Sequence, residues 1–312
     1  MPSNQTPLGA LPARFRRQRV LLVGCGDVGL RVARRIPPAV GLTAVTSSPD
    51  RLAELRALGI RPLLANLDDP ASLRRLAGLA TRVLHLAPPP GEGWTDPRTR
   101  SLVTALRRRS QPDALVYGST SGVYGDCRGA VVTEARPARA DTPRARRRVD
   151  AERAVRFLGR TAGSRVSILR IPGIYGVDRE GGTPRSRLLK GTPVLLPADD
   201  VHTNHIQADD LARGCIAALW RGRAQRTYNI NDDSQLKMGD YFDLAADLYG
   251  LPRPPRVARM TAQTELPLML LSFMSESRRM DNTRMKRELR LRLHFPLVDM
   301  GLRADPVGNS VK

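Results

Sequence analysis

The sequence predicts an α/β protein: a doubly wound parallel sheet with a smaller, discontinuous C-terminal lobe. Three observations lead to this fold class. Short apolar runs alternate with helical patterns over residues 19–170, which is the signature of βαβ units in a parallel sheet. The first apolar run stops at a glycine-rich turn that opens a helix. After residue 171 the alternation ends, and loops rich in glycine, proline and charge follow.

Six strands and five connecting helices are expected in the first half. The strands are short apolar runs that stop at turn-forming residues, and they span residues 19–23, 42–46, 61–65, 82–86, 114–117 and 167–170. The helices carry apolar residues at helical spacing, and they span residues 30–36, 49–58, 70–77, 99–109 and 145–160. Six strands with five crossovers fit a doubly wound sheet.

The second half predicts a different organisation. Helices are expected at residues 209–220, 239–249 and 277–289, with one strand at 228–230. We therefore divide the chain into a disordered leader at residues 1–18, a sheet domain at 19–170 to which 203–230 returns, a lobe from 171–202 and 231–300, and a tail at 301–312. The lobe is expected to cover the ends of the strands and to carry substrate selectivity.

Length and composition favour a globular protein without a membrane span or a metal. The chain has 312 residues, 41% of them hydrophobic, and no run reaches the roughly 18 apolar residues that a spanning helix needs. The four histidines provide few metal ligands. The three cysteines lie far apart without a C-x-x-C pattern, which favours a reducing cytoplasm; they are Cys25, Cys127 and Cys215.

The net charge of the chain is strongly positive, but this alone does not indicate that the protein binds nucleic acid. The net charge is +21, and the 51 basic residues comprise 47 arginines and four lysines. This ratio, together with abundant alanine, glycine and proline, is typical of a GC-rich genome. The densest run, Arg144 to Arg148, has no interleaved aromatic residues, which favours a solvated helix face over a nucleic-acid surface.

A glycine-rich turn follows the first strand and predicts a dinucleotide site of the Rossmann type. Its pattern is G-x-G-x-x-G, in the order that the mechanism requires. The first glycine permits the tight turn, the second lets the backbone approach the pyrophosphate, and the third lets the helix pack on the strand. The expected contacts are Gly24, Cys25, Gly26, Asp27, Val28 and Gly29.

The end of the second strand favours NADP(H) over NAD(H). A carboxylate at this position would bind the adenosine ribose and favour NAD, but here the strand is followed by Ser47 and Ser48, with Arg51 close behind. Hydroxyls and an arginine suit a 2′-phosphate, although Asp50 could take the ribose role. The ends of the next two strands should complete the cofactor site; the residues expected there are Asn66, Ala87 and Pro88.

Four segments, in the same order along the chain, resemble the extended short-chain dehydrogenase/reductase group, the NAD-dependent epimerase/dehydratase family. They are VYGSTSGVYG at residues 116–125, LRIPGIYG at 169–176, NHIQADDLA at 204–212 and YNI at 228–230. The resemblance covers about residues 19 to 300. It implies a small-molecule substrate of unknown identity, and it makes a homodimer plausible.

The resemblance also implies a catalytic Ser or Thr with a Tyr-x-x-x-Lys pair. Thr120 matches the hydroxyl position, but Arg144 and Arg148 stand at the Tyr and Lys positions, and no Tyr-x-x-x-Lys occurs in the chain. A guanidinium stays protonated and cannot replace a tyrosine as proton donor. The G-x-G-x-x-G pattern of this chain is also shorter than the glycine pattern of most family members. Both departures resemble an atypical subgroup that keeps the fold and loses the tyrosine.

Three functional interpretations follow. The first is an NAD(P)-dependent oxidoreductase or epimerase-like enzyme in which Tyr124 replaces the missing acid, with Arg148 as its cation; Tyr124 could instead be a structural residue of its turn. The second is a non-catalytic sensor that binds dinucleotide and reports its redox state to a partner. The third and weakest is a nucleic-acid-associated protein. We favour the first.

Overall fold

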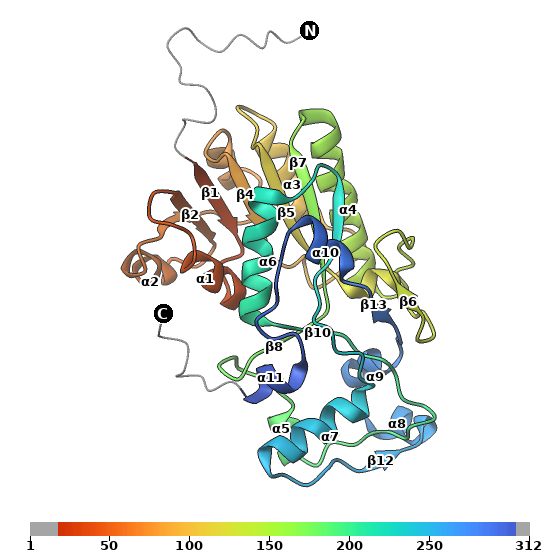
Figure 1. Ribbon diagram of the computed structural model, residues 1–312. Coiled ribbons are helices and arrows are strands. Elements are labelled where there is room, and N and C mark those ends of the chain that lie inside the picture. Colours follow the sequence, from red (N-terminus) through yellow and green to blue (C-terminus); the bar gives the residue numbers. More distant parts are fainter. Residues whose placement is uncertain (1–17, 304–312) are drawn as a thin grey trace, which may run out of the picture.

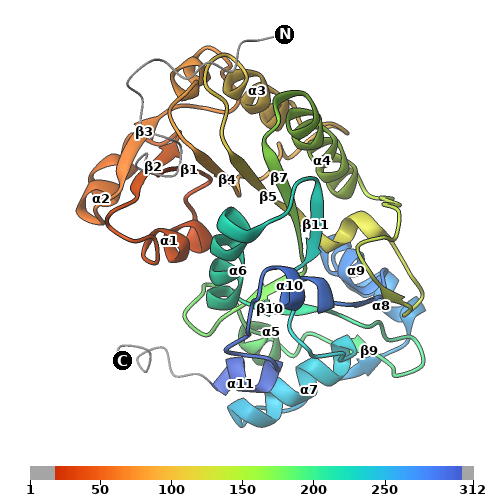
Figure 2. The same cartoon turned by 45° about the horizontal axis from the view of Figure 1, so that its top comes forward.

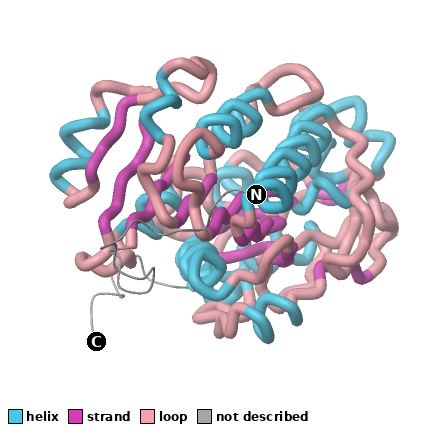
Figure 3. The backbone as a smooth tube through the Cα atoms, turned by 90° about the horizontal axis from the view of Figure 1, so that it is seen from above, coloured by secondary structure: helices cyan, strands magenta, loops and turns pink. Residues whose placement is uncertain are grey.

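The computed structural model describes residues 18–303 and confirms the expected fold class. A seven-stranded parallel sheet lies between helices on both of its faces, and a lobe covers one end of the strands (Figure 1 and, seen from above, Figure 3). The expected leader up to residue 17, and the part of the expected tail from residue 304, lie outside the described residues. Residues 301–303 of the expected tail belong to a helix.

Seven strands run in parallel in the order β11-β7-β5-β4-β1-β2-β3. Their bounds are Arg19–Val23 (β1), Gly41–Thr46 (β2), Arg61–Leu64 (β3), Arg82–His85 (β4), Ala114–Thr120 (β5), Arg165–Ile171 (β7) and Arg226–Asn229 (β11). The chain proceeds outward from β1 to β3 and then returns to the other side of β1 with β4. This reversal between β1 and β4 is the topological switch point, where ligands bind beyond the carboxyl ends of the strands.

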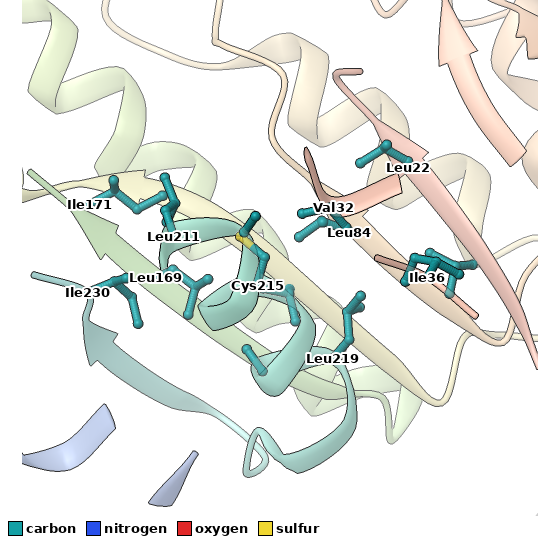
Figure 4. Close-up of a cluster of buried hydrophobic side chains, with 14 of the residues drawn as sticks. Leu22, Val32, Ile36, Leu84, Leu169, Ile171, Leu211, Cys215, Leu219 and Ile230 are labelled. Atoms are coloured by element: carbon teal, nitrogen blue, oxygen red, sulfur yellow. The ribbon is translucent and has the colours of Figure 1, made fainter. Parts of the chain in front are cut away.

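Helices cover the two faces because alternate strand residues point to opposite sides. The helices are Asp27–Ala33 (α1), Arg51–Ala57 (α2), Pro97–Leu106 (α3), Pro143–Ala162 (α4) and Ala208–Arg221 (α6), with a 3-10 helix at Ser72–Leu76. Leu22 joins an apolar cluster with Val32 of α1 and Cys215 of α6 (Figure 4). Its neighbour Leu21 faces the other cluster, which includes Leu102 of α3. Each such buried side chain stabilises the fold by about 1.5–3 kcal/mol.

The lobe has its own apolar cluster at the carboxyl edge of the sheet (Figures 1 and 2). Its strands pair two by two, β8 with β10 and β9 with β12. The lobe elements are Gly173–Tyr175 (β8), Arg185–Leu189 (α5), Val194–Leu195 (β9), His205–Gln207 (β10), Met238–Tyr249 (α7), Arg256–Val257 (β12), Arg259–Glu265 (α8), Leu268–Met274 (α9) and Val298–Arg303 (α11).

The helix expected over residues 277–289 is wrong in its first half. Residues Arg279–Met280 form a strand (β13) that pairs with Val131–Val132 (β6), and only Thr283–Glu288 is helical (α10). Two buried amides hold the extended segment: Asn204 Oδ1 accepts from Met280 N at 2.7 Å, and Asn231 Nδ2 donates to Met280 O at 3.0 Å. These partners are distant in sequence, so the local helical pattern does not reveal them.

Within residues 18–303 no helix is long and apolar enough to cross a membrane. The same part of the chain contains no group of three or more His, Cys, Asp or Glu residues placed to hold a metal ion. All three cysteines are buried and free.

The stability of the sheet domain is expected to fall in acid because of His85. Burial and the charge of Arg148 lower the pKa of His85 to about 3, from about 6.5 in an unfolded chain. The Nε2 atom lies 2.9 Å from Thr99 Oγ1, whose hydroxyl donates to Asp96. The neutral ring is therefore the stable form. Its contribution to the free energy of unfolding is fully present above about pH 6.5 and is lost as the pH falls towards 3.

We expect the His85 contribution to decrease by about 1.4 kcal/mol per pH unit below pH 6.5. Urea unfolding at pH 7 and pH 5 measures this loss. Burial also lowers the pKa of His205 to about 4, so acid lowers the free energy of unfolding through His205 as well. In the His85→Asn variant, the free energy of unfolding should fall less steeply between pH 7 and pH 5. An unchanged pH dependence would contradict the assignment of this loss to His85.

Candidate functional site

Two of the three loop glycines are required by packing, and the third leaves space for a ligand. Gly24 has φ +94°, and a Cβ there would lie 2.3 Å from Ala87 N. A Cβ on Gly29 would lie 2.6 Å from Gly24 O, so the loop packs tightly on α1. A Cβ on Gly26 would meet no atom within 4 Å. The loop therefore offers open space at the switch point, where a pyrophosphate would lie.

The loop side chains themselves point into the protein or bind arginines. Cys25 is 3% exposed, and burial raises the pKa of its thiol. The carboxylate of Asp27 accepts from Arg31 at 2.9 Å and from Arg179 at 2.6 Å. Val28 packs against the core cluster. What the loop presents to a ligand is consequently its backbone.

Arg51 lies beside the glycine loop at the end of β2. Its Nη1 donates to the carbonyl of Cys25 at 2.8 Å, and its Nε donates to Glu54 Oε2 at 3.2 Å. Ser48 is tied to the strand end, because its N donates to Thr46 Oγ1 at 3.2 Å, while Ser47 is exposed. One arginine and two serines thus border the place where the adenosine ribose would lie, and the exposed Asp50 follows them.

The ends of β3 and β4 are joined by another arginine. Arg98 of α3 binds Asp68 through its Nε at 2.7 Å and its Nη2 at 2.6 Å, and its Nη1 lies 3.4 Å from the carbonyl of Pro88. Ala87 forms the backbone floor under Gly24. Asn66 is exposed, and its Oδ1 accepts from Asp68 N at 3.0 Å. These loops border the same edge of the sheet as the glycine loop.

A pocket of about 540 Å³ lies between the end of β5 and the lobe. Thr120, Gly122 and Arg144 line it on the side of the sheet. The lobe contributes a polar and aromatic wall from β8, α5, β10, α7 and the segment before β10: Tyr175, Arg187, His202, His205, Tyr241 and Phe242. The residues after β8 also line it, and one of them, Arg179, is the arginine that binds Asp27 of α1.

A model of the NAD-dependent epimerase/dehydratase family matches residues 32–231. The chain belongs to this family. The match begins within α1, after the glycine loop, and ends just beyond β11, so it includes the pocket residues on the sheet side. It confirms the resemblance seen in the four sequence segments.

Solved structures show the same fold over almost the whole chain. A functionally unknown conserved protein from Silicibacter pomeroyi DSS is 31% identical, with 91% of this chain and 96% of that chain covered and a TM-score of 0.78. UDP-glucuronic acid 4-epimerase from Bacillus cereus, in complex with NAD, is 18% identical, with 92% and 97% covered and a TM-score of 0.70. The dTDP-glucose 4,6-dehydratase of Streptomyces venezuelae is 22% identical, with 91% and 94% covered and a TM-score of 0.72. No curated protein matches the chain.

Thr120, the residue at the family's hydroxyl position, lies at the pocket. It ends β5, and its Oγ1 accepts from Gly122 N at 3.3 Å, which starts the 3-10 helix Ser121–Tyr124. The hydroxyl hydrogen is left to donate to a ligand. We expected β5 to stop at residue 117, and the three further paired residues are what carry Thr120 to the pocket edge.

The surroundings of Tyr124 favour a structural role over the expected role as replacement acid. Its side chain is fully buried outside the pocket lining, and its Oη donates to Asn229 Oδ1 at 2.7 Å. The cation beside its ring is Arg170, 4.5 Å from the ring centre, and not Arg148. Burial raises the pKa of Tyr124, the opposite of what a proton donor near neutral pH needs. The geometry supports the structural interpretation of this residue.

The two arginines at the Tyr and Lys positions have different surroundings. Arg148 is half-buried, and its Nη1 donates to the carbonyl of Gly118 at 2.8 Å and to Tyr117 Oη at 3.1 Å. It therefore fixes the end of β5. Arg144 lines the pocket, is exposed, and forms no ion pair with any residue in the described part of the chain.

Sequence reasoning missed the buried network behind Thr120 and the lobe wall. Glu152 accepts from Ser119 Oγ at 2.7 Å and from Arg170 at 2.9 and 3.1 Å. The alternation of β7 could have placed Arg170 on a buried face, because Ile168, two residues earlier on the same face, is apolar. No local signal singles out Arg187 or His205 as pocket residues.

Proposed function

We propose that this family member is an NADP(H)-dependent oxidoreductase or epimerase-like enzyme with a non-standard active site. The observation that carries the proposal is the arrangement at the carboxyl edge of the sheet. The open glycine loop lies at the switch point, and the pocket that contains Thr120 opens at the same edge. A dinucleotide along this edge would have its nicotinamide end towards the pocket. The substrate would be a small molecule.

The residues present fit such a cofactor. The backbone of residues 24–29 would hold the pyrophosphate, because Gly26 leaves that space open. Asn66, Ala87 and Pro88 would border the adenosine half. Ser47, Ser48 and Arg51 would bind a 2′-phosphate. The nicotinamide ring would supply hydride transfer when bound.

The chain's own contribution to the reaction would be orientation and polarisation. The Thr120 hydroxyl would donate to the reacting oxygen of the substrate. Arg148 would keep β5 in position, so that Thr120 is presented to the pocket. Arg144 would bind substrate or cofactor as a fixed cation, since it cannot exchange a proton at working pH. The family's phenol is absent, so the accompanying proton has to be carried by another group of the pocket or by water.

A calorimetric titration with NADPH and NADH tests the cofactor part. Binding with preference for NADPH is expected, followed by turnover on a panel of carbonyl and sugar substrates. Absence of binding for both dinucleotides would overturn the proposal. The homodimer and the cytoplasmic location expected from the sequence stay predictions.

Arg51→Gln is expected to weaken NADPH binding by about 10- to 100-fold and to leave NADH binding almost unchanged, because only NADPH offers a phosphate to this guanidinium. Arg56→Gln is the matched control, since Arg56 is exposed on the same helix. Calorimetry of the two variants, each titrated with NADPH and with NADH, measures the effect. An equal loss for both dinucleotides would contradict a role for Arg51 in selectivity.

A second candidate function is a dinucleotide-dependent sensor without turnover. Arg144 at the tyrosine position favours it, because this substitution removes the usual acid and leaves the binding surface in place. The sensor would bind oxidised and reduced cofactor with different affinities and show no steady-state rate on any substrate. A reproducible rate would exclude it.

A further inference from the structure

The pocket carries an excess of positive charge that the protein does not neutralise. Four arginines line it, together with a single carboxylate among the described residues. Arg179 is paired with Asp27 at 2.6 Å, and Arg278 is paired with that one carboxylate, Glu276, at 2.7 Å. The other two, Arg144 and Arg187, form no ion pair within residues 18–303. Arg144 lies on the sheet side of the pocket and Arg187 on the lobe side.

Arg187 says more about the ligand than Arg144 does, because its guanidinium is partly buried and has no ion-pair partner within residues 18–303. It belongs to α5, and its guanidinium lies 4.4 Å from the ring centre of Phe242. Its Nε and Nη2 are buried and make no hydrogen bond in the part of the chain that the structure describes. Burial lowers the pKa of Arg187. A cation is costly in such a place unless a negative group pairs with it.

Neighbouring side chains in the pocket wall also have unpartnered polar atoms. His205 is 7% exposed and Tyr175 is 2% exposed, and neither His205 Nδ1 nor Tyr175 Oη has a hydrogen-bond partner within residues 18–303. Burial lowers the pKa of His205 to about 4, so its ring is neutral at pH 7. Its ring also lies against that of Tyr241, with ring centres 4.2 Å apart and an angle of 34° between the ring planes. The rings of His205 and Tyr241 can contact the uncharged, ring-like part of a ligand, and Arg187 can then pair with its charged group.

We propose that the pocket binds an anionic small molecule whose carboxylate or phosphate pairs with Arg187. The planar guanidinium suits both groups, because two parallel N–H donors match two oxygens. The body of the molecule lies against Tyr241 and His205, and its reacting carbon is directed towards Thr120 on the sheet side. The inference deepens the proposed function, since it takes this pocket as the substrate site.

Chemical modification of the full-length protein tests this inference without knowledge of the substrate. Phenylglyoxal reacts with accessible arginines, and mass spectrometry gives the rate at each position. We expect inorganic phosphate or benzoate at millimolar concentration to slow modification of Arg187 severalfold. Benzamide, the uncharged analogue of benzoate, should have no effect. Arg185, which is exposed on the same helix, should react at the same rate throughout, with ionic strength held constant by chloride.

Calorimetry with the protective anion supplies the second arm. Arg187→Gln is expected to weaken its binding by about 10- to 100-fold, and Arg185→Gln to leave it unchanged. Protection by phosphate alone would indicate a phosphate ester as substrate, and protection by benzoate alone a carboxylate. Equal protection by benzamide, no protection by either anion, or full binding to Arg187→Gln would overturn the inference.

The same samples separate this inference from the proposed function. NADPH binding is measured in each by calorimetry. If NADPH binds and no anion protects Arg187, the inference alone fails. If an anion protects Arg187 and no dinucleotide binds, the proposed function fails and the anion site stands.

Discussion

Replacing Glu152 with alanine is expected to lower the free energy of unfolding by about 3–5 kcal/mol. Glu152 on α4 and Arg170 on β7 are 4% and 5% exposed, and both Glu152 oxygens accept hydrogen bonds from Arg170. Removing the carboxylate leaves the guanidinium buried without its counter-charge. It also removes the acceptor of the hydrogen bond that Ser119 Oγ donates, and Ser119 directly precedes Thr120. The loss should therefore extend to the shape of the pocket edge.

The double variant Glu152→Leu with Arg170→Met is the control for this prediction. It removes both charges and keeps apolar volume, so it should recover much of the stability lost in the single variant. Urea unfolding, followed by circular dichroism, measures both. A loss below about 1 kcal/mol in Glu152→Ala would show that the pair is not the buried unit described above.

Gly26→Arg is expected to abolish dinucleotide binding while the free energy of unfolding changes by less than about 0.5 kcal/mol. A side chain at Gly26 meets no protein atom within 4 Å, so it is accommodated by the fold and occupies the space of the pyrophosphate. Gly24→Ala is the contrasting variant. Its Cβ would lie 2.3 Å from Ala87 N at a backbone φ of +94°, so this change should destabilise the protein as well.

Calorimetry with NADPH and urea unfolding of both variants provide the measurement. A Gly26→Arg protein that is folded and still binds NADPH with unchanged affinity would show that the dinucleotide, if bound, does not use this loop. A Gly24→Ala protein as stable as the wild type would contradict the close contact between the loop and the end of β4.

The sheet domain could be predicted from the sequence because its signals are local. Each strand is a short apolar run, and each helix shows apolar residues on one face, so element type and order follow from neighbouring residues alone. Even there, the helix expected at residues 70–77 is only the 3-10 helix Ser72–Leu76, and the length of β5 was underestimated. Residues 118–120 are Gly-Ser-Thr, and their strand pairing depends on β7, about 50 residues away.

The surroundings of Tyr124 could not be predicted from the sequence, because long-range contacts decide them. Tyr124 lies four residues beyond the end of β5, and the sequence does not show that Asn229, 105 positions away, accepts the hydrogen bond of its hydroxyl. In the same way, 47 arginines look alike in the sequence. Only the structure shows that Arg170, Arg179 and Arg278 bind acidic partners while Arg187 has none among residues 18–303.

The loop that follows β8 joins the two halves of the site. Asp178 binds Arg31 of α1 at 2.8 Å, the next residue, Arg179, binds Asp27 at the start of α1, and Arg179 also lines the pocket. Any shift of this loop on filling the pocket is transmitted to the helix that begins at the glycine loop. Thermodynamic linkage makes the effect reciprocal: the factor by which one ligand alters the affinity for the other is the same in both directions. A substrate analogue would then reveal itself in the dinucleotide titration even without turnover.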